Sequence, residues 1–152
     1  MSIPAGEFCA WLTGMRAALA GTADSDVPCG SCTACCRSGQ FVHVGPEDER
    51  ALAVIPPELL FAAPGLPAGN FVMGYDQDGC CPMLVDDACT IYADRPRTCR
   101  VFDCRLFTAL DRVNDDTPMI AQRIRAWEFT YADDATRAQA DAIRAAGRLD
   151  PE

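Results

Sequence analysis

Positive charge is scarce in this chain of 152 residues, and long apolar runs are missing. Thirteen Lys and Arg residues oppose twenty-two Asp and Glu residues, which gives a net charge of -9 and a pI of about 4.5. An acidic chain is repelled by phosphate backbones and by anionic lipid, and no stretch approaches the roughly 20 apolar residues of a membrane-spanning helix. We therefore expect neither nucleic acid nor a membrane as a partner.

Common catalytic and cofactor motifs are also absent. The sequence has no P-loop, no G-x-G-x-x-G and no H-E-x-x-H, and its carboxylates form no paired motif. The one histidine, His43, lies in a strand expected over residues 41–44, where it would face opposite to the neighbouring valines. Imidazole is a common metal ligand, but nothing in the sequence places His43 beside a thiol. No catalytic constellation is found, and whether the chain is an enzyme stays open.

The N-terminal segment lacks the pattern of a secretory signal. It has no leading basic region, and Glu7, Thr13 and Arg16 interrupt its apolar residues. A helix over residues 5–20, ending near Gly21, is predicted instead from apolar residues at helical spacing: Phe8, Trp11, Leu12, Met15 and Leu19. We expect a cytoplasmic chain, and in that compartment clustered cysteines favour a metal over disulfides.

The size and the order of the predicted elements indicate one small α+β domain over residues 1–152. Its centre, residues 29–104, is cysteine-rich, and we expect it to be irregular, stapled by metal and built with short hairpin strands. Helical extensions are predicted on both sides of this centre, over residues 5–20 and 117–148.

Prolines and turn residues indicate where the helices and strands of residues 29–104 begin and end. Acidic residues after Pro46 predict a helix that ends near Ile55, before two prolines, and a further helical turn is expected over residues 58–61. The turn sequence of residues 76–79 predicts a hairpin of strands 71–75 and 81–85. Asp86 and Asp87 predict a second turn.

Two helices are predicted near the C-terminus. Thr117 and Pro118 form a helix start, and Ile120, Ile124, Trp127 and Tyr131 follow at helical spacing. The last helix is expected from about Asp134 to Ala146, ending at Gly147.

The ten cysteines carry the strongest signal in the sequence. Cys29, Cys32, Cys35 and Cys36 form a C-x2-C-x2-C-C run, and the C-x2-C spacing lets two thiolates converge on one ion. On a helix the four sulfurs would span an arc of roughly 120°. Adjacent Cys35 and Cys36 would still diverge, so one of them serves a second metal, a bridge or an outer role.

Further cysteines follow in short motifs: Cys81-Pro-Met-Leu84, Cys89-Thr-Ile-Tyr92 and Arg95-Pro-Arg-Thr-Cys99-Arg100. Together with the first run, these motifs resemble the YkgJ-type cysteine-cluster family, the CxxCxxCC zinc- or iron-chelating domain, over residues 29–104, about half of the chain. The resemblance implies a set of metal ligands: Cys29, Cys32, Cys35, Cys36, Cys81, Cys89, Cys99 and, as a frequent trailing cysteine, Cys104. Cys9 and Cys80 fall outside the pattern, and Cys9 is expected in the core. Cys80 is either a chance neighbour or a substitute ligand.

Eight thiols could form two four-sulfur sites, one iron–sulfur cluster with spare thiols, or a multi-zinc cluster. The ferredoxin-like spacing of the first run slightly favours an iron–sulfur cluster over zinc. A centre with four thiolates carries a charge of about -2 with zinc or a [4Fe–4S] core. Arginines interleaved with the later cysteines could balance this charge: Arg95, Arg97, Arg100 and Arg105.

The leading hypothesis is a metal-binding protein that holds zinc or iron through residues 29–36 and 81–104. The metal would organise a surface for a protein partner or take part in metal handling. The alternative is a redox enzyme or sensor that uses an iron–sulfur centre or the vicinal pair Cys35–Cys36. A third class is an interaction module stapled by disulfides.

Overall fold

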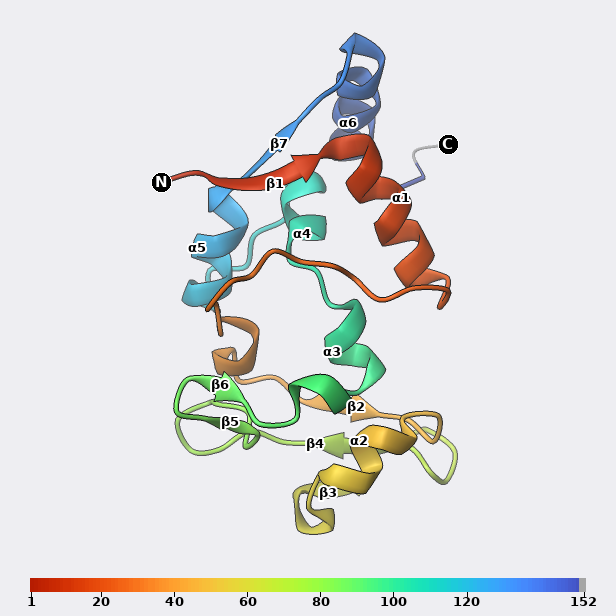
Figure 1. Ribbon diagram of the computed structural model, residues 1–152, viewed down its shortest axis with the longest axis vertical. Helices are drawn as coiled ribbons and strands as arrows, with labels where there is room; N and C mark the ends of the chain where they lie inside the picture. Colours follow the sequence, from red (N-terminus) through yellow and green to blue (C-terminus); the bar gives the residue numbers. More distant parts are fainter. Residues whose placement is uncertain (151–152) are drawn as a thin grey trace. The chain divides into compact units, whose positions relative to one another are not determined.

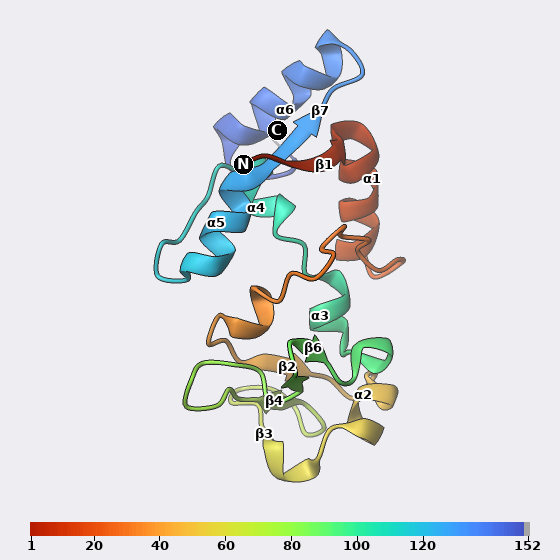
Figure 2. The ribbon, with the colours of Figure 1, turned by 60° about the vertical axis from the view of Figure 1, so that its left-hand side comes forward.

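The computed structural model describes residues 1–150, and the chain divides into two compact units (Figures 1 and 2). Met1–Pro28 and Asp103–Glu152 form one unit, called the terminal unit below, and Cys29–Phe102 forms the other, called the cysteine unit. The fold class is α+β, as the sequence predicts, with 39% helix and 15% strand. Within residues 1–150, no helix has the length and apolar character needed to cross a membrane.

The terminal unit joins the two ends of the chain through a parallel strand pair. Its elements in order are β1 (Ile3–Glu7), α1 (Phe8–Leu19), α4 (Arg105–Ala109), α5 (Pro118–Ala126), β7 (Trp127–Thr130) and α6 (Asp134–Ala146). Strand β1 runs beside β7 (Figure 1), with Ile3 opposite Trp127 and Glu7 opposite Thr130. Helix α6 packs against α1 and α4.

Aromatic side chains fill the core of the terminal unit. Phe8, Trp11 and Trp127 are buried, and the Phe8 ring lies 5.2 Å from that of Phe129 in an edge-to-face arrangement. Such ring pairs add stability beyond the area they bury. The apolar stripe of α1 is therefore its core face.

Two sequence predictions for this unit need correction. The N-terminal helix begins at Phe8 because residues 3–7 are extended and pair with β7. On α1 the core position is taken by Ala18, while Leu19 is 55% exposed. The helix predicted through Tyr131 ends at Ala126, and Trp127 begins a strand. The helical spacing of Trp127 and Tyr131 cannot reveal a strand partner more than a hundred residues away.

The bounds predicted for the last helix are confirmed by α6, which runs from Asp134 to Ala146. The Asp133 carboxylate accepts a hydrogen bond of 2.8 Å from the N–H of Thr136, which caps the N-terminus of the helix. Gly147 follows Ala146 with a φ of 69°, the left-handed conformation that glycine adopts without steric cost.

The cysteine unit is built from short elements. Its strands and helices are β2 (Val42–Val44), α2 (Glu49–Val54), β3 (Leu60–Ala62), β4 (Phe71–Met73), β5 (Leu84–Val85), β6 (Ala88–Cys89) and α3 (Arg97–Val101). Three 3₁₀ helices join them: Cys35–Arg37, Pro57–Leu59 and Tyr92–Asp94. Strand β4 lies between β2 and β3 in an antiparallel sheet, and β5 and β6 form a hairpin.

A small apolar core lies on one face of the three-stranded sheet. It consists of Val44, Ala51, Ile55, Met73 and Met83. Alternation along the strands places Val44 and Met73 on the same face, against Ala51 of α2. Six partly buried side chains pack against these five residues, so the fully buried part of the core is small: Val42, Leu52, Leu59, Leu60, Cys81 and Ile91.

The predicted hairpin of residues 71–75 and 81–85 is wrong. Both edges of β4 are occupied by β2 and β3, which leaves no edge for residues 81–85. The turn itself forms, because the N–H of Gly79 donates to the carbonyl of Asp76 at 3.0 Å. The residues after it pair in a different hairpin, β5 with β6.

Asp86 and Asp87 close the β5–β6 hairpin, as predicted, with φ values of 52° and 62°. Two successive left-handed residues make the turn that matches the twist of paired strands. The predicted helix ending near Ile55 is confirmed by α2. The helical turn expected over residues 58–61 is a 3₁₀ helix that ends at Leu59, followed by β3.

Candidate metal centre

Backbone hydrogen bonds join two distant cysteine motifs in the cysteine unit. The N–H of Cys81 donates to the carbonyl of Cys36 at 2.7 Å, and the N–H of Gly39 donates to the carbonyl of Gly79 at 2.9 Å. Because these bonds involve main-chain atoms, the chain itself holds the end of the first cysteine run against the Cys80–Cys81 pair.

Five thiols gather around this junction and are called the thiol cluster below: Cys35, Cys36, Cys81, Cys89 and Cys99. They come from the 3₁₀ helix Cys35–Arg37, the loop before β5, the end of β6 and the middle of α3. Cys35 is exposed, and the other four are half-buried. Their sulfurs are close enough for the charge on one to shift the pKa of another.

Cys35 and Cys36 act on each other most strongly. The Cys36 thiol donates a hydrogen bond to the Cys35 sulfur, which is the main reason that the pKa of Cys35 falls to about 6. The same hydrogen bond raises the pKa of Cys36, and burial and the neighbouring thiolates raise it further. The vicinal pair thus contains one thiolate and one thiol that stabilises it.

The pKa values of Cys81 and Cys99 are raised, in contrast to that of Cys35. Burial is the main cause that raises the pKa of Cys81, followed by repulsion from Cys89 and Cys35. Burial also raises the pKa of Cys99 to about 12, with further contributions from Cys35, Cys81 and Cys89. Repulsion among thiolates at one place is what a bound cation relieves.

Arg95 provides positive charge beside the thiol cluster. Its guanidinium lowers the pKa of Cys35 and that of Cys99. The same group lies 3.9 Å from the centre of the Tyr92 ring, and its Nε donates to the Tyr92 carbonyl at 2.8 Å. These contacts with Tyr92 orient the arginine toward the thiols.

Arg37 links three parts of the centre, a role that the sequence analysis missed. Its Nε donates to the Thr33 hydroxyl at 3.0 Å, and its Nη1 lies 3.8 Å from the Cys80 sulfur. Its Nη2 forms an ion pair with Asp87 in the turn of the β5–β6 hairpin. Arg37 therefore ties the first cysteine run to the hairpin that carries Cys89. The adjacency of Arg37 to Cys36 is the one signal in the sequence that could have indicated this.

The other arginines predicted to balance the centre have different partners. Arg100 forms an ion pair of 3.6 Å with buried Asp48, and the backbone N–H of Arg97 donates to the same carboxylate at 2.8 Å. Arg105 lies in the terminal unit, where it is buried and paired with Asp103 at 2.8 Å. Among the contacts described, Arg95 is the predicted arginine that lowers the pKa of a clustered thiol.

Cys29 and Cys32 form a turn of their own. The N–H of Cys32 donates to the carbonyl of Cys29 at 3.1 Å, and both residues are half-buried in the cysteine unit. The groups that dominate the pKa shifts in the thiol cluster do not include either of them. The C-x2-C turn therefore keeps both of its sulfurs in the cysteine unit.

Cys104, the last predicted ligand, belongs to the terminal unit. It is buried, and its sulfur accepts a hydrogen bond of 3.0 Å from the indole N–H of Trp127. The other seven predicted ligands belong to the cysteine unit. The surroundings of Cys104 are those of a packed core residue.

The remaining candidates are placed as follows. Cys9 is exposed on α1, contrary to the expected core position, because the buried face of that helix begins at Phe8 and continues at Trp11. Cys80 contacts Arg37. The ring of His43 lies 2.9 Å from the amide oxygen of Asn70, so its partner is a side-chain amide rather than a thiol.

The donor set of the thiol cluster suits zinc or iron. Four thiolates satisfy a tetrahedral zinc ion or a [4Fe–4S] cluster, and the cluster offers five. Across residues 1–150, no three Cys, His, Asp or Glu side chains already form a coordination sphere. The five thiols influence one another's pKa values without forming such a sphere.

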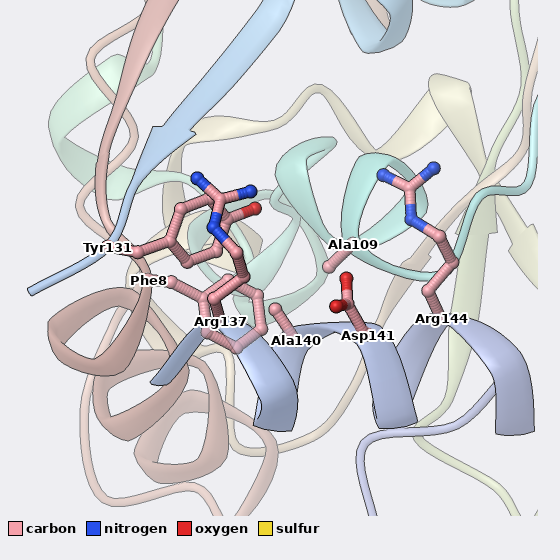
Figure 3. A pocket seen from close by; sticks show the side chains of 7 residues that line it. All are labelled: Phe8, Ala109, Tyr131, Arg137, Ala140, Asp141 and Arg144. Atoms are coloured by element: carbon pink, nitrogen blue, oxygen red, sulfur yellow. The ribbon is translucent and has the colours of Figure 1, made fainter. Parts of the chain in front are cut away.

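A pocket of about 330 Å³ in the terminal unit has a different character (Figure 3). Phe8 and Ala109 contribute to its lining, and Arg137, Asp141 and Arg144 extend from α6. The Arg137 guanidinium lies 4.3 Å from the centre of the Tyr131 ring, and Arg144 is 3.5 Å from Asp111. No thiol lines this pocket, so it plays no part in the candidate metal centre.

Comparison with known proteins identifies the cysteine motifs. The model of one protein family matches residues 28–119, which is more than half of the chain, and its description is "CxxCxxCC: Putative zinc- or iron-chelating domain". The match includes the whole thiol cluster. No curated protein and no solved structure matches the chain.

Proposed function

The chain belongs to the CxxCxxCC family of zinc- or iron-chelating domains, and we propose that it binds zinc or iron through its thiol cluster. The observation that carries this proposal is the convergence of five thiols from four separate elements around the Cys36–Cys81 backbone bond. Thiolate sulfur is a preferred ligand of zinc and of iron–sulfur clusters.

The ligands we assign to the metal are Cys35, Cys81, Cys89 and Cys99. Cys36 then keeps its proton and donates a hydrogen bond to Cys35. This division follows the expectation that the sulfurs of adjacent Cys35 and Cys36 diverge. Cys104 is left out of the proposed ligand set because its sulfur already accepts the hydrogen bond from the Trp127 indole.

Charge supports the same assignment. Four thiolates around zinc or a [4Fe–4S] core leave a charge of about -2, which needs nearby cations or hydrogen-bond donors. Arg95 supplies a cation that acts on Cys35 and Cys99. Cys36 supplies a donor. The cysteine unit therefore provides one cation and one hydrogen-bond donor that offset part of this charge.

The metal would also stabilise the cysteine unit. Its strands contain two or three residues each, and its apolar core is small. A structural zinc ion contributes an apparent 10–16 kcal/mol, roughly, to the folding of a small metal-binding domain. A metal that joins α3, β6 and the loop before β5 would hold together elements that apolar burial alone does not fix.

The choice between zinc and iron has a direct test. We would purify the chain under anaerobic and under aerobic conditions and measure metal content and the absorbance spectrum of each preparation. About one equivalent or more of zinc in a colourless protein, or of iron in a coloured protein that oxygen bleaches, supports the proposal. The C-x2-C-x2-C spacing favours the coloured form.

The same preparations distinguish the alternatives. Well below one equivalent of any transition metal in both would overturn the proposal. Free thiols counted after denaturation without reductant then identify the replacement. A Cys35–Cys36 disulfide would indicate thiol redox chemistry, and extensive pairing of the ten cysteines would indicate a disulfide-stapled module.

A further inference from the structure

The three-stranded sheet of the cysteine unit has one face away from its core. Met73 of β4 packs into the core, and Val72 therefore points to the opposite face. Phe61 of β3 and His43 of β2 stand opposite Val72 in the register, so they share that outer face. Phe41, two residues before His43, continues the same face.

Three aromatic rings gather on this side of the sheet and are called the aromatic patch below: Phe41, Phe61 and Tyr75. They are 60%, 47% and 45% exposed. The Phe41 ring lies 6.0 Å from Phe61 and 5.3 Å from Tyr75, centre to centre. A methyl group at Gly74 would meet both phenylalanine rings at 3.8 Å, so this glycine lies beneath the junction of the rings.

Clustered exposure of this kind marks an interaction surface. Scattered apolar side chains are normal on a protein surface, but contiguous aromatic groups are costly to leave in water. Phenylalanine and tyrosine are also enriched among the residues that anchor protein interfaces. The patch is made of rings in mutual contact from three segments of the chain.

The charged side chains of the chain segment that carries Phe61 and Tyr75 are all negative. Residues 51–94 contain neither lysine nor arginine, but they contain six carboxylates: Glu58, Asp76, Asp78, Asp86, Asp87 and Asp94. Asp76 and Asp78 follow Tyr75 directly in the chain, and Glu58 precedes β3, and all three are exposed. Asp87 pairs with Arg37 and Asp94 with Arg50, so the carboxylates nearest the rings along the chain, Glu58, Asp76 and Asp78, supply the negative charge.

We propose that the aromatic patch is the docking site for a basic segment of a protein partner. Arginine and lysine side chains bind to the faces of aromatic rings, and their charge is attracted to the flanking carboxylates. The apolar parts of the same side chains cover the rings. A second copy of this chain would bring like charge to the contact, since the net charge is -9.

The probe for this proposal is a peptide of alternating arginine and leucine, titrated calorimetrically into the 152-residue chain as purified. We expect binding that weakens by about tenfold or more when Phe41→Ser and Phe61→Ser are combined, since buried aromatic anchors dominate interface energies. The same peptide with glutamate in place of arginine should not bind. Tyr75→Ala, a single change at a 45% exposed side chain, should weaken binding in the same direction.

Leu19→Ala is the matched control, because Leu19 is 55% exposed in the terminal unit and should leave binding unchanged. Metal content measured on every variant separates loss of docking from loss of the metal centre. Equal affinity of the wild type, the double variant and Tyr75→Ala for the basic peptide would overturn the proposal. The proposal would also be overturned if sedimentation showed a wild-type dimer and a monomeric double variant. The patch would then be an interface between two copies of this chain.

Discussion

The N–H of Cys81 and the carbonyl of Cys36 form a hydrogen bond of 2.7 Å that joins the two cysteine motifs through their main chains. No sulfur takes part in this bond, so the junction does not depend on the protonation of any thiol. The metal would therefore bind to a site of which one side is already assembled. In the proposed site, the remaining thiols come from Cys89 on β6 and Cys99 on α3.

Replacing one clustered thiol should remove metal and stability together. We expect Cys89→Ser to lower the metal content by about one equivalent and to lower the thermal midpoint. The proposed four-sulfur site loses one ligand, and the free energy of metal binding contributes to the free energy of folding. Elemental analysis and a thermal melt measure both. Cys9→Ser, at an exposed position on α1, should change neither.

Cys32→Ser tests the first half of the family motif. The motif predicts a loss of metal, and the separate turn of Cys29 and Cys32 predicts that this loss is smaller than for Cys89→Ser. A loss as large as that of Cys89→Ser would place Cys32 among the ligands.

Arg37→Met should loosen the metal centre without unfolding the protein. The variant loses the links to Thr33, Cys80 and Asp87, so the hairpin that carries Cys89 is held less firmly. We expect a chelator to remove the metal about tenfold faster, in line with the effect of other groups that orient metal ligands. Arg50→Met is the control, because Arg50 pairs with Asp94 and is 76% exposed. Equal rates for both variants would show that Arg37 does not position the thiols.

Removing one partner of the buried Asp103–Arg105 ion pair should lower the free energy of unfolding of the terminal unit. Asp103 accepts hydrogen bonds from Arg105 at 2.8 Å and from the Trp11 indole at 3.1 Å. Asp103→Ala leaves a buried guanidinium without its partner, and we expect a loss of about 3–5 kcal/mol. Urea unfolding followed by tryptophan fluorescence reports on this unit, since Trp11 and Trp127 are the two tryptophans of the chain.

A solvent-exposed pair gives the comparison. Asp115→Ala removes the partner of Arg125 at a position that is 76% exposed and should change the unfolding midpoint little. If Asp103→Ala had an equally small effect, the buried pair would not stabilise the terminal unit.

The Asp133 cap of α6 should make the stability of the fold depend on pH in the acidic range. The hydrogen bond from the N–H of Thr136 holds the pKa of Asp133 below its usual value. A group whose pKa is lower in the folded state stabilises the fold above its unfolded pKa and loses this effect as the pH falls through the folded value. Asp133→Ala should therefore be less stable than the wild type at neutral pH, and the gap should close under acid conditions. Asp133→Asn, which keeps a capping oxygen, should be affected less at neutral pH.

Local signals in the sequence predict local structure well. Asp133 and Gly147 bound α6 because a side-chain cap and a left-handed glycine act within one turn of the helix. Asp86 and Asp87 form the predicted turn for the same reason. The errors involve distant partners: Trp127 leaves its predicted helix to pair with β1, and residues 81–85 find both edges of β4 occupied. No local pattern reveals which strand edge is already taken.

For the candidate site, too, local motifs are predicted from the sequence and distant contacts are not. The motifs identify all five cysteines of the thiol cluster from residue types and spacing alone. They do not tell which of the eight predicted thiols meet at one ion, because this depends on the path of the chain in space rather than on spacing along it. The role of Arg37 depends on an ion pair with Asp87, fifty residues later, which spacing cannot predict.

X-ray absorption at the zinc or iron edge of the purified protein tests the central claim most directly. The account predicts a first shell of sulfur, at about 2.3 Å for zinc, without nitrogen or oxygen ligands. Cys99→Ser, on α3, should introduce an oxygen into this shell or lower the metal content. A first shell of nitrogen and oxygen atoms, or an unchanged all-sulfur shell at full occupancy in a variant that lacks both Cys89 and Cys99, would contradict it.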